Sequence, residues 1–153
     1  MKLQFEVEGV KEISAKLDML ASVKDFSEPF RASKKHLDRG VQRNYHSQGS
    51  YFGQRWQKLS APYRHWKAKH YTGRGILVRT GALRKGFVGQ VSSTGLIYTN
   101  LVSYYSYHQS SAPRSTNLPR RVMLKLTNEM RTEIFREFTK FMYKKEKEQG
   151  FRI

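Results

Sequence analysis

The chain opens with alternating apolar and polar side chains, the pattern of a half-buried strand. Leu3, Phe5 and Val7 occupy the apolar positions, and Gly9 ends the alternation. The apolar spacing then becomes helical, which predicts a short amphipathic helix that ends near Ser22. The apolar side chains of this helix are Val10, Ile13, Leu17 and Leu20.

Helical spacing also predicts two longer helices. One begins at Ser27, a candidate N-cap residue followed by Pro29 in the first turn. Its apolar residues are Phe30, Leu37, Val41 and Tyr45. The other begins near Asn128 and has the longest apolar face in the chain, so we expect it to supply core that covers a sheet. Its apolar residues are Met130, Ile134, Phe138, Phe141 and Met142.

Shorter elements are predicted between these helices. A Gly- and Ser-rich loop over residues 47–60 carries Tyr51, Phe52 and Trp56, and a short helix is expected from Ser60. The aliphatic run at residues 76–78 has the composition of a strand.

A hairpin and a long loop are predicted next. Residues 87–105 indicate two strands joined by a tight turn at Ser93, Thr94 and Gly95. Residues 106–121 are small and polar and contain two prolines, which predicts a loop. We expect this loop to be mobile in the isolated subunit and ordered in an assembly, because loops of this length are usually functional or disordered.

The order of elements predicts the fold class. Strand, helices, loop, hairpin and helix follow one another without strict strand–helix alternation, which favours an α+β fold. We expect one domain over residues 1–153, with a small, mostly antiparallel sheet packed against helices, a long loop and a C-terminal helix.

Charge narrows the possible functions. The formal net charge is +17, and residues 39–128 hold fifteen Lys and Arg residues and no Asp or Glu. Paired carboxylates, a carboxylate that orients a histidine, and acidic magnesium ligands are therefore all missing from the centre of the chain. We expect no enzyme activity.

The sequence gives little support for a metal site, a cofactor site or a membrane segment. The chain has no cysteine, and its histidines lack metal-ligand spacing, so we expect no metal site. No phosphate-binding glycine loop is present, and we expect no cofactor. The charged N-terminus does not resemble a secretion signal, and no apolar run could span a bilayer, so we expect an intracellular protein that does not contact a membrane.

Two functions remain open for the basic centre. It could contact nucleic-acid phosphates without sequence preference, with Tyr104, Tyr105 and Tyr107 as candidate stacking residues. Alternatively, it could dock onto an acidic protein or line a channel through which nucleic acid passes.

Four motifs in order resemble the phage virion morphogenesis family, the tail completion proteins of tailed bacteriophages related to phage Mu. They are "YFGQRWQKLS", "GILVRTGALRKGF", "YYSYHQ" and "LPRRVMLKLT" ahead of the last helix. The matching residues are Phe52, Gly53, Trp56, Leu59, Ser60, Ile76, Leu77, Thr80, Gly81, Leu83, Tyr105, His108, Gln109, Pro119 and Arg121.

The resemblance implies a small α+β virion subunit without catalytic activity. It implies a homo-oligomeric ring, expected to be a hexamer, at the tail end or neck of the phage, in contact with other neck or tail proteins and with the DNA in the channel. The aliphatic residues of "GILVRTGALRKGF" would then pack into the subunit. The candidate interface or channel-facing residues are Arg79, Arg84, Lys85, His108, Arg114, Arg120 and Arg121.

Overall fold

The computed structural model describes residue 18 and residues 21–110 and 118–148. The predicted N-terminal strand lies outside the described residues. Of the short helix that follows it, only Asp18, Ala21 and Ser22 are described, and these three residues are helical.

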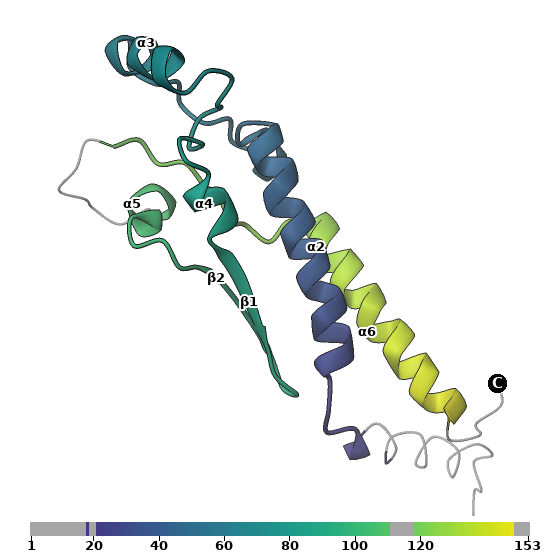
Figure 1. The fold of residues 1–153 in the computed structure, drawn as a ribbon. Helices are drawn as coiled ribbons and strands as arrows, with labels where there is room; N and C mark the ends of the chain where they lie inside the picture. The colour runs from purple at the N-terminus through teal and green to yellow at the C-terminus, as the bar shows by residue number, and fades with distance from the viewer. Residues whose placement is uncertain (1–17, 19–20, 111–117, 149–153) are drawn as a thin grey trace, which may run out of the picture.

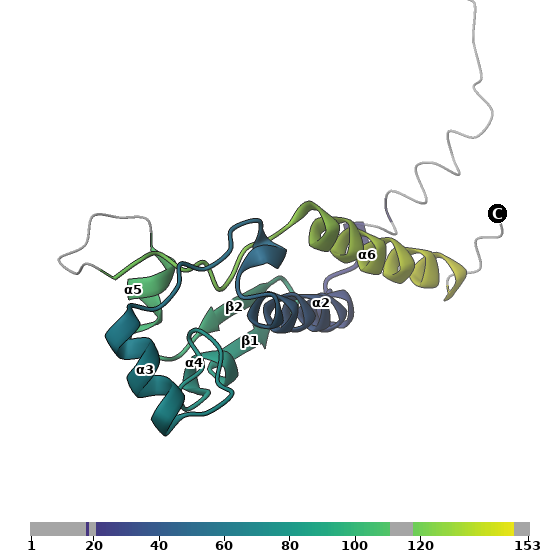
Figure 2. The same ribbon diagram turned by 90° about the horizontal axis from the view of Figure 1, so that it is seen from above.

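Two long helices form the body of the molecule. Helix α2 (Ser27–His46) lies between a β-hairpin and helix α6 (Asn128–Glu148), so both long helices are on one side of the hairpin (Figures 1 and 2). The hairpin consists of β1 (Phe87–Val91) and β2 (Leu96–Asn100), which pair antiparallel. This arrangement confirms the predicted α+β fold.

Four short elements lie at one end of α2. Helix α3 projects from this end of the molecule, whereas α4 and α5 lie beside the hairpin (Figure 1). The four are the 3-10 helix η1 (Ser50–Phe52), α3 (Ala61–His70), α4 (Ala82–Lys85) and α5 (Tyr105–Gln109).

Helix α2 begins where the sequence predicts, but Ser27 is its first helical residue rather than its N-cap. The backbone N–H of Ser27 donates instead to the Asp25 side chain, at 2.8 Å. The predicted apolar residues Leu37, Val41 and Tyr45 are all buried. Gly40 brings α6 close, since a Cβ atom there would meet the Met130 methyl carbon at 2.8 Å.

Helix α6 supplies core, as predicted, but it packs mainly against α2, which lies between it and the hairpin, rather than covering the sheet itself. Met130 and Phe141 are buried against α2 and its N-terminal flank. Phe138 is half-buried, and its ring packs edge-on against Phe30 at 5.1 Å between ring centroids. The opposite face of α6 is open, and Phe135 on it is 72% exposed.

The hairpin turns where expected, but its second strand ends at Asn100, so the prediction of strand over residues 101–105 is wrong. Phe87 pairs with Asn100 and Val91 with Leu96, and the N–H of Ser92 donates to the carbonyl oxygen of Gly95. Tyr98 points toward α2, where its hydroxyl donates to Asp38 at 2.7 Å. The hairpin is thereby tied to the middle of α2.

The core consists of two adjoining clusters. One contains Val41, Tyr45, Trp56, Leu83 and Met123, and the other contains Leu37, Phe52, Val122 and Met130. Tyr98 packs against both clusters, so the hairpin closes the core on one side.

The strand predicted at residues 76–78 is wrong. These residues form a turn in which Leu77 has a φ of 59° and the N–H of Ile76 donates to the Gln48 side chain. In a strand, successive side chains point to opposite faces. In this turn all three aliphatic residues pack against the first core cluster, as the sequence predicts for them, which explains why the turn is preferred.

The predicted loop over residues 106–121 is also wrong at its start. Residues 105–109 form helix α5, with the ring of Tyr105 packed edge-on against Phe87 at 5.7 Å. Gln109, the last residue of α5, bonds through its side chain to the backbone of Met123 and Leu124, which fixes this turn of helix on the core. Residues 111–117, including Arg114, lie outside the described residues.

Candidate assembly surface

A groove of about 500 Å³ runs between α2, α4 and the hairpin. Its lining is rich in cations, and we refer to it as the basic groove. The residues that define its chemistry are Asp38, Gln42, Arg74, Arg84, Lys85 and Tyr98.

Local structure fixes α4 at the wall of this groove. Gly81 precedes the helix with a φ of 88°, a value that favours glycine, and Leu83 is buried beneath it. The Asn100 side chain at the end of β2 donates to the carbonyl oxygen of Leu83 at 2.7 Å. The hairpin therefore holds the helical turn that carries Arg84 and Lys85.

The side chains of the two cations of α4 differ in how firmly they are positioned. The Nε of Arg84 donates to the side-chain oxygen of Gln42 at 2.6 Å, so its guanidinium is positioned on α2. Lys85 is exposed. The groove thus offers one oriented guanidinium and one exposed ammonium to a partner.

Asp38 does not neutralise these cations, because its carboxylate is already engaged. One oxygen is 2.7 Å from the ammonium of Lys34, and the other accepts from Tyr98. Burial and the hydrogen bond to Asp38 raise the pKa of the Tyr98 hydroxyl far above its ordinary value, so it stays a neutral donor. The groove therefore keeps a net positive charge and suits an anionic group.

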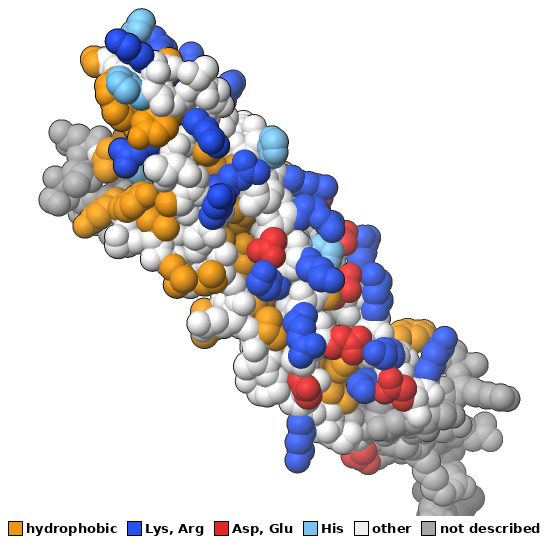
Figure 3. Space-filling view, viewed as in Figure 1, with side chains coloured by type: hydrophobic (Ala, Val, Ile, Leu, Met, Phe, Trp, Pro, Cys, Tyr) orange, Lys and Arg blue, Asp and Glu red, His pale blue; other side chains and the backbone are white. Residues whose placement is uncertain are grey.

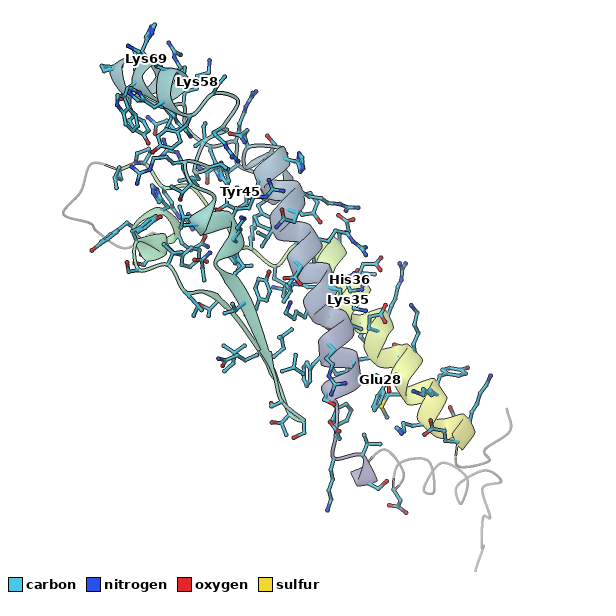
Figure 4. The ribbon with its side chains drawn as sticks, viewed as in Figure 1. Glu28, Lys35, His36, Tyr45, Lys58 and Lys69 are labelled. Carbon is cyan, nitrogen blue, oxygen red and sulfur yellow. The ribbon has the colours of Figure 1, made fainter. Side chains whose placement is uncertain are left out.

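Helix α3, which we call the aromatic arm, is the second exposed basic feature. The rings of Tyr63, Trp66 and His70 stack along one side of it, with ring centroids 5.5 Å and 4.9 Å apart. Lys58, just before the arm, and Lys69 within it are labelled at its end in Figure 4. Blue side chains surround this end of the molecule, and red ones are absent from the face that Figure 3 shows there.

Only one residue of the arm is buried. Lys67 turns inward, and its ammonium donates to the carbonyl oxygen of Gly75 at 2.5 Å. Burial lowers the pKa of Lys67, and the nearby Arg121 and Arg79 lower it further. This single anchor leaves the aromatic side of the arm exposed.

The structure places the predicted site residues in different environments. Arg84 and Lys85 share the basic groove. Arg79 is exposed in the turn after Val78, and Arg120 is exposed with its Nε donating to the carbonyl oxygen of Gln109.

The other two described candidates belong to the interior framework. His108 is half-buried on α5, and its carbonyl oxygen accepts from the N–H of Arg121. Arg121 is only 5% exposed and donates twice to the carbonyl oxygen of Gln57, at 3.0 Å and 3.2 Å. Burial also lowers its pKa. Arg121 is therefore not part of the exposed cationic surface.

Arg74 was missing from the candidates predicted from the sequence. It lines the groove although it precedes α4 by a loop, and no local pattern marks it. Lys58 and Lys69 were missed in the same way. The only sequence signal that covers all three is the acid-free segment to which they belong.

The motif residues themselves lie mostly inside the molecule. Phe52, Trp56 and Leu83 are buried in the core clusters, and Gln109 and Arg121 bond to backbone groups of other segments. The buried residues of the four motifs therefore help to specify the fold, while cations within the same motifs, among them Lys58, Lys85 and Arg120, are exposed on its surface.

Two further properties bear on function. Within the described residues, no group of three or more His, Asp or Glu side chains could hold a metal ion. None of the described helices combines the length and apolar character needed to cross a membrane.

The geometry defines a small α+β protein with a closely packed core and cationic surfaces. The phage virion morphogenesis family matches residues 6–142, and the chain belongs to it. This family membership indicates a role in the assembly of a bacteriophage virion. No curated protein and no solved structure matches the chain.

Proposed function

We propose that this protein completes the tail of a tailed bacteriophage and joins it to the head, as a non-catalytic ring of identical subunits at the tail end or neck. Membership of the virion morphogenesis family carries this proposal. The ring is expected to be a hexamer, in contact with other neck or tail proteins.

The cationic surface supports a joining role. Residues 39–128 contribute fifteen Lys and Arg residues with no acid, and the structure gathers several of them at the basic groove and the aromatic arm. Such a surface attracts an acidic neighbouring protein or the phosphates of DNA in the channel. Arg79 and Arg120 are exposed and extend it.

Removal of the gene from the phage genome tests the proposal. Electron micrographs of the lysate should then show DNA-filled heads and separate tails, and joined particles should return when the protein is supplied in trans. Joined, infectious particles in its absence would overturn the proposed function.

A second candidate function is sequence-independent binding of nucleic acid. The exposed aromatic stack of the arm, flanked by Lys58 and Lys69, favours it, because such proteins combine cations with rings on which bases stack. A gel shift with salt titration separates the two. Binding at physiological salt with a steep dependence on salt concentration would favour this second function.

A further inference from the structure

One long segment of this highly charged protein carries no charged side chain. Charged residues make up 27% of the chain, yet residues 86–110 contain no Lys, Arg, Asp or Glu. This segment forms the hairpin and α5, with the connection between them.

Four exposed side chains of this segment are large and apolar or aromatic, and the other exposed ones are uncharged. Ile97 and Leu101 are 66% and 70% exposed, and Tyr104 and Tyr107 are also exposed. We call these four residues and Thr99 the neutral flank. Figure 3 shows orange and white atoms over α5 and the hairpin, whereas blue and red atoms follow α2 and α6.

The alternation of β2 explains why the flank faces outward. Tyr98 turns toward α2 and is fixed by its bond to Asp38, so Ile97 and Thr99 on either side of it point away from the core. The part of the flank on β2 is therefore a consequence of the hairpin's register, which a one-residue slip would reverse, whereas Tyr104 and Tyr107 lie at and on α5.

The hairpin also lacks the usual protection of exposed sheet edges. Within the described residues the sheet has two strands, so each strand has one edge without a strand neighbour. Proteins commonly prevent such edges from pairing with another chain by placing Lys, other charged residues or Pro on them. Neither β1 nor β2 contains any of these residues.

Charge decides which partner suits this surface. An acidic protein or DNA would be drawn to the basic groove and the aromatic arm, and gains no electrostatic attraction from the flank. Two copies of a chain with a net charge of +17 repel each other, and this repulsion is smallest where they meet through uncharged surface. Interface cores are likewise depleted of charge and enriched in Tyr.

We propose that the neutral flank is the surface through which one subunit contacts a second copy of this chain. The inference rests on the proposed ring, since a ring needs a contact between copies. In a ring the flank meets a different surface of its neighbour, whereas a contact between two flanks gives a closed dimer.

Photo-crosslinking in assembled particles tests the contact directly. A photo-reactive amino acid replaces Leu101 in one variant and Phe135, on the open face of α6, in a matched control. We expect the variant at position 101 to give a product of twice the chain mass of 18.0 kDa, and the control to give none. Products only with DNA or with another protein, or no product at all, would overturn the proposal.

Sedimentation of the purified full chain gives a second measurement. Leu101→Arg should weaken self-association by about tenfold or more, as loss of a central apolar contact does, while Phe135→Arg, which adds the same charge, should not. Circular dichroism and thermal unfolding check that both variants fold. Equal weakening in both variants, or in neither, contradicts the inference. These measurements report only the contact between copies. A negative result here would overturn the proposed contact and leave the head–tail joining function standing, and a failure of the gene-removal test would overturn the joining function without bearing on the contact.

Discussion

The indole Nε1 of Trp56 donates a hydrogen bond of 2.9 Å to the carbonyl oxygen of Val122. The Asn44 side chain donates to the same oxygen, at 3.0 Å. One buried carbonyl thus joins α2, the loop after η1 and the segment that leads into α6. Two of the four sequence motifs, one carrying Trp56 and the other Val122, therefore meet at this point.

Replacement of Trp56 by Phe should destabilise the protein by about 1–3 kcal/mol, because a buried hydrogen bond is lost from a well-packed site. Denaturant unfolding of the purified chain measures the change. Trp66→Phe is the matched control, since Trp66 lies on the exposed side of the arm and should change stability by less than about 0.5 kcal/mol. Equal effects of the two substitutions would contradict the role of the Val122 contact.

Two phenylalanines of α6 test which of its faces supplies core. Phe141 is buried and packs against Phe26 at 5.7 Å between ring centroids, so Phe141→Ala should cost about 3–5 kcal/mol. Phe135→Ala, on the open face of the same helix, should change the free energy of unfolding by less than about 0.5 kcal/mol. The urea concentration at the unfolding midpoint of each variant measures the change in stability. A large loss of stability in Phe135→Ala would mean that this face is also buried in solution.

Helices α2 and α6 and the hairpin could be predicted from the sequence because their apolar spacing is regular, and α3 because Ser60 marks its start, whereas the short helices α4 and α5 were not predicted. Helices α2, α3 and α6 begin at or next to the predicted residues, and the hairpin turns at Ser93–Gly95 as predicted. Residues 76–78 show the limit of such reasoning. Their conformation depends on the Gln48 side chain, which is distant in sequence, and on the core that all three residues contact.

The site was harder to predict, because charge pattern does not distinguish an exposed arginine from a buried one. Arg120 and Arg121 are neighbours in an acid-free segment, yet only Arg120 is exposed. The difference arises from the carbonyl oxygen of Gln57, which lies beside Arg121 only in the folded chain. The neutral flank also needed the structure, since it combines outward-facing residues of β2 with Leu101 and with tyrosines at α5, a helix that the sequence did not predict.

Buried tyrosines should make the protein lose stability in alkaline solution. Burial raises the pKa of Tyr105 from its usual 10.0 to about 12. The unfolded chain therefore releases this proton at lower pH than the folded one. The resulting stability is complete below about pH 10 and is lost as pH rises through about 12.

Tyr105→Phe should reduce this alkaline loss of stability without abolishing it, because Tyr45 and Tyr98 also have raised pKa values, mainly through burial. The free energy of unfolding, measured from pH 8 upward, should fall less steeply in the variant above pH 10. The ultraviolet absorbance of tyrosinate, followed in the same samples, reports the titration itself. An identical pH profile for the two proteins would show that Tyr105 titrates normally.

The basic groove should matter for joining heads to tails and not for folding. Arg74 and Lys85 line it and are exposed, so the double variant Arg74→Glu/Lys85→Glu should fold with an unchanged thermal midpoint. Reversing two charges at a contact with an acidic partner replaces attraction by repulsion. The yield of infectious particles should then fall by about tenfold or more.

The control for the groove is a double variant with the same change in net charge on another surface. Lys35→Glu/Arg131→Glu places both substitutions on exposed positions of α2 and α6, outside the groove lining, and should support particle formation as the wild type does. Lys35 is labelled on α2 in Figure 4. If both double variants lose activity together, net charge rather than the groove matters. If only the groove variant fails, a gel shift with phage DNA identifies its partner: unchanged DNA binding assigns the groove to an acidic neighbouring protein, and weakened binding with a reduced salt dependence assigns it to the DNA.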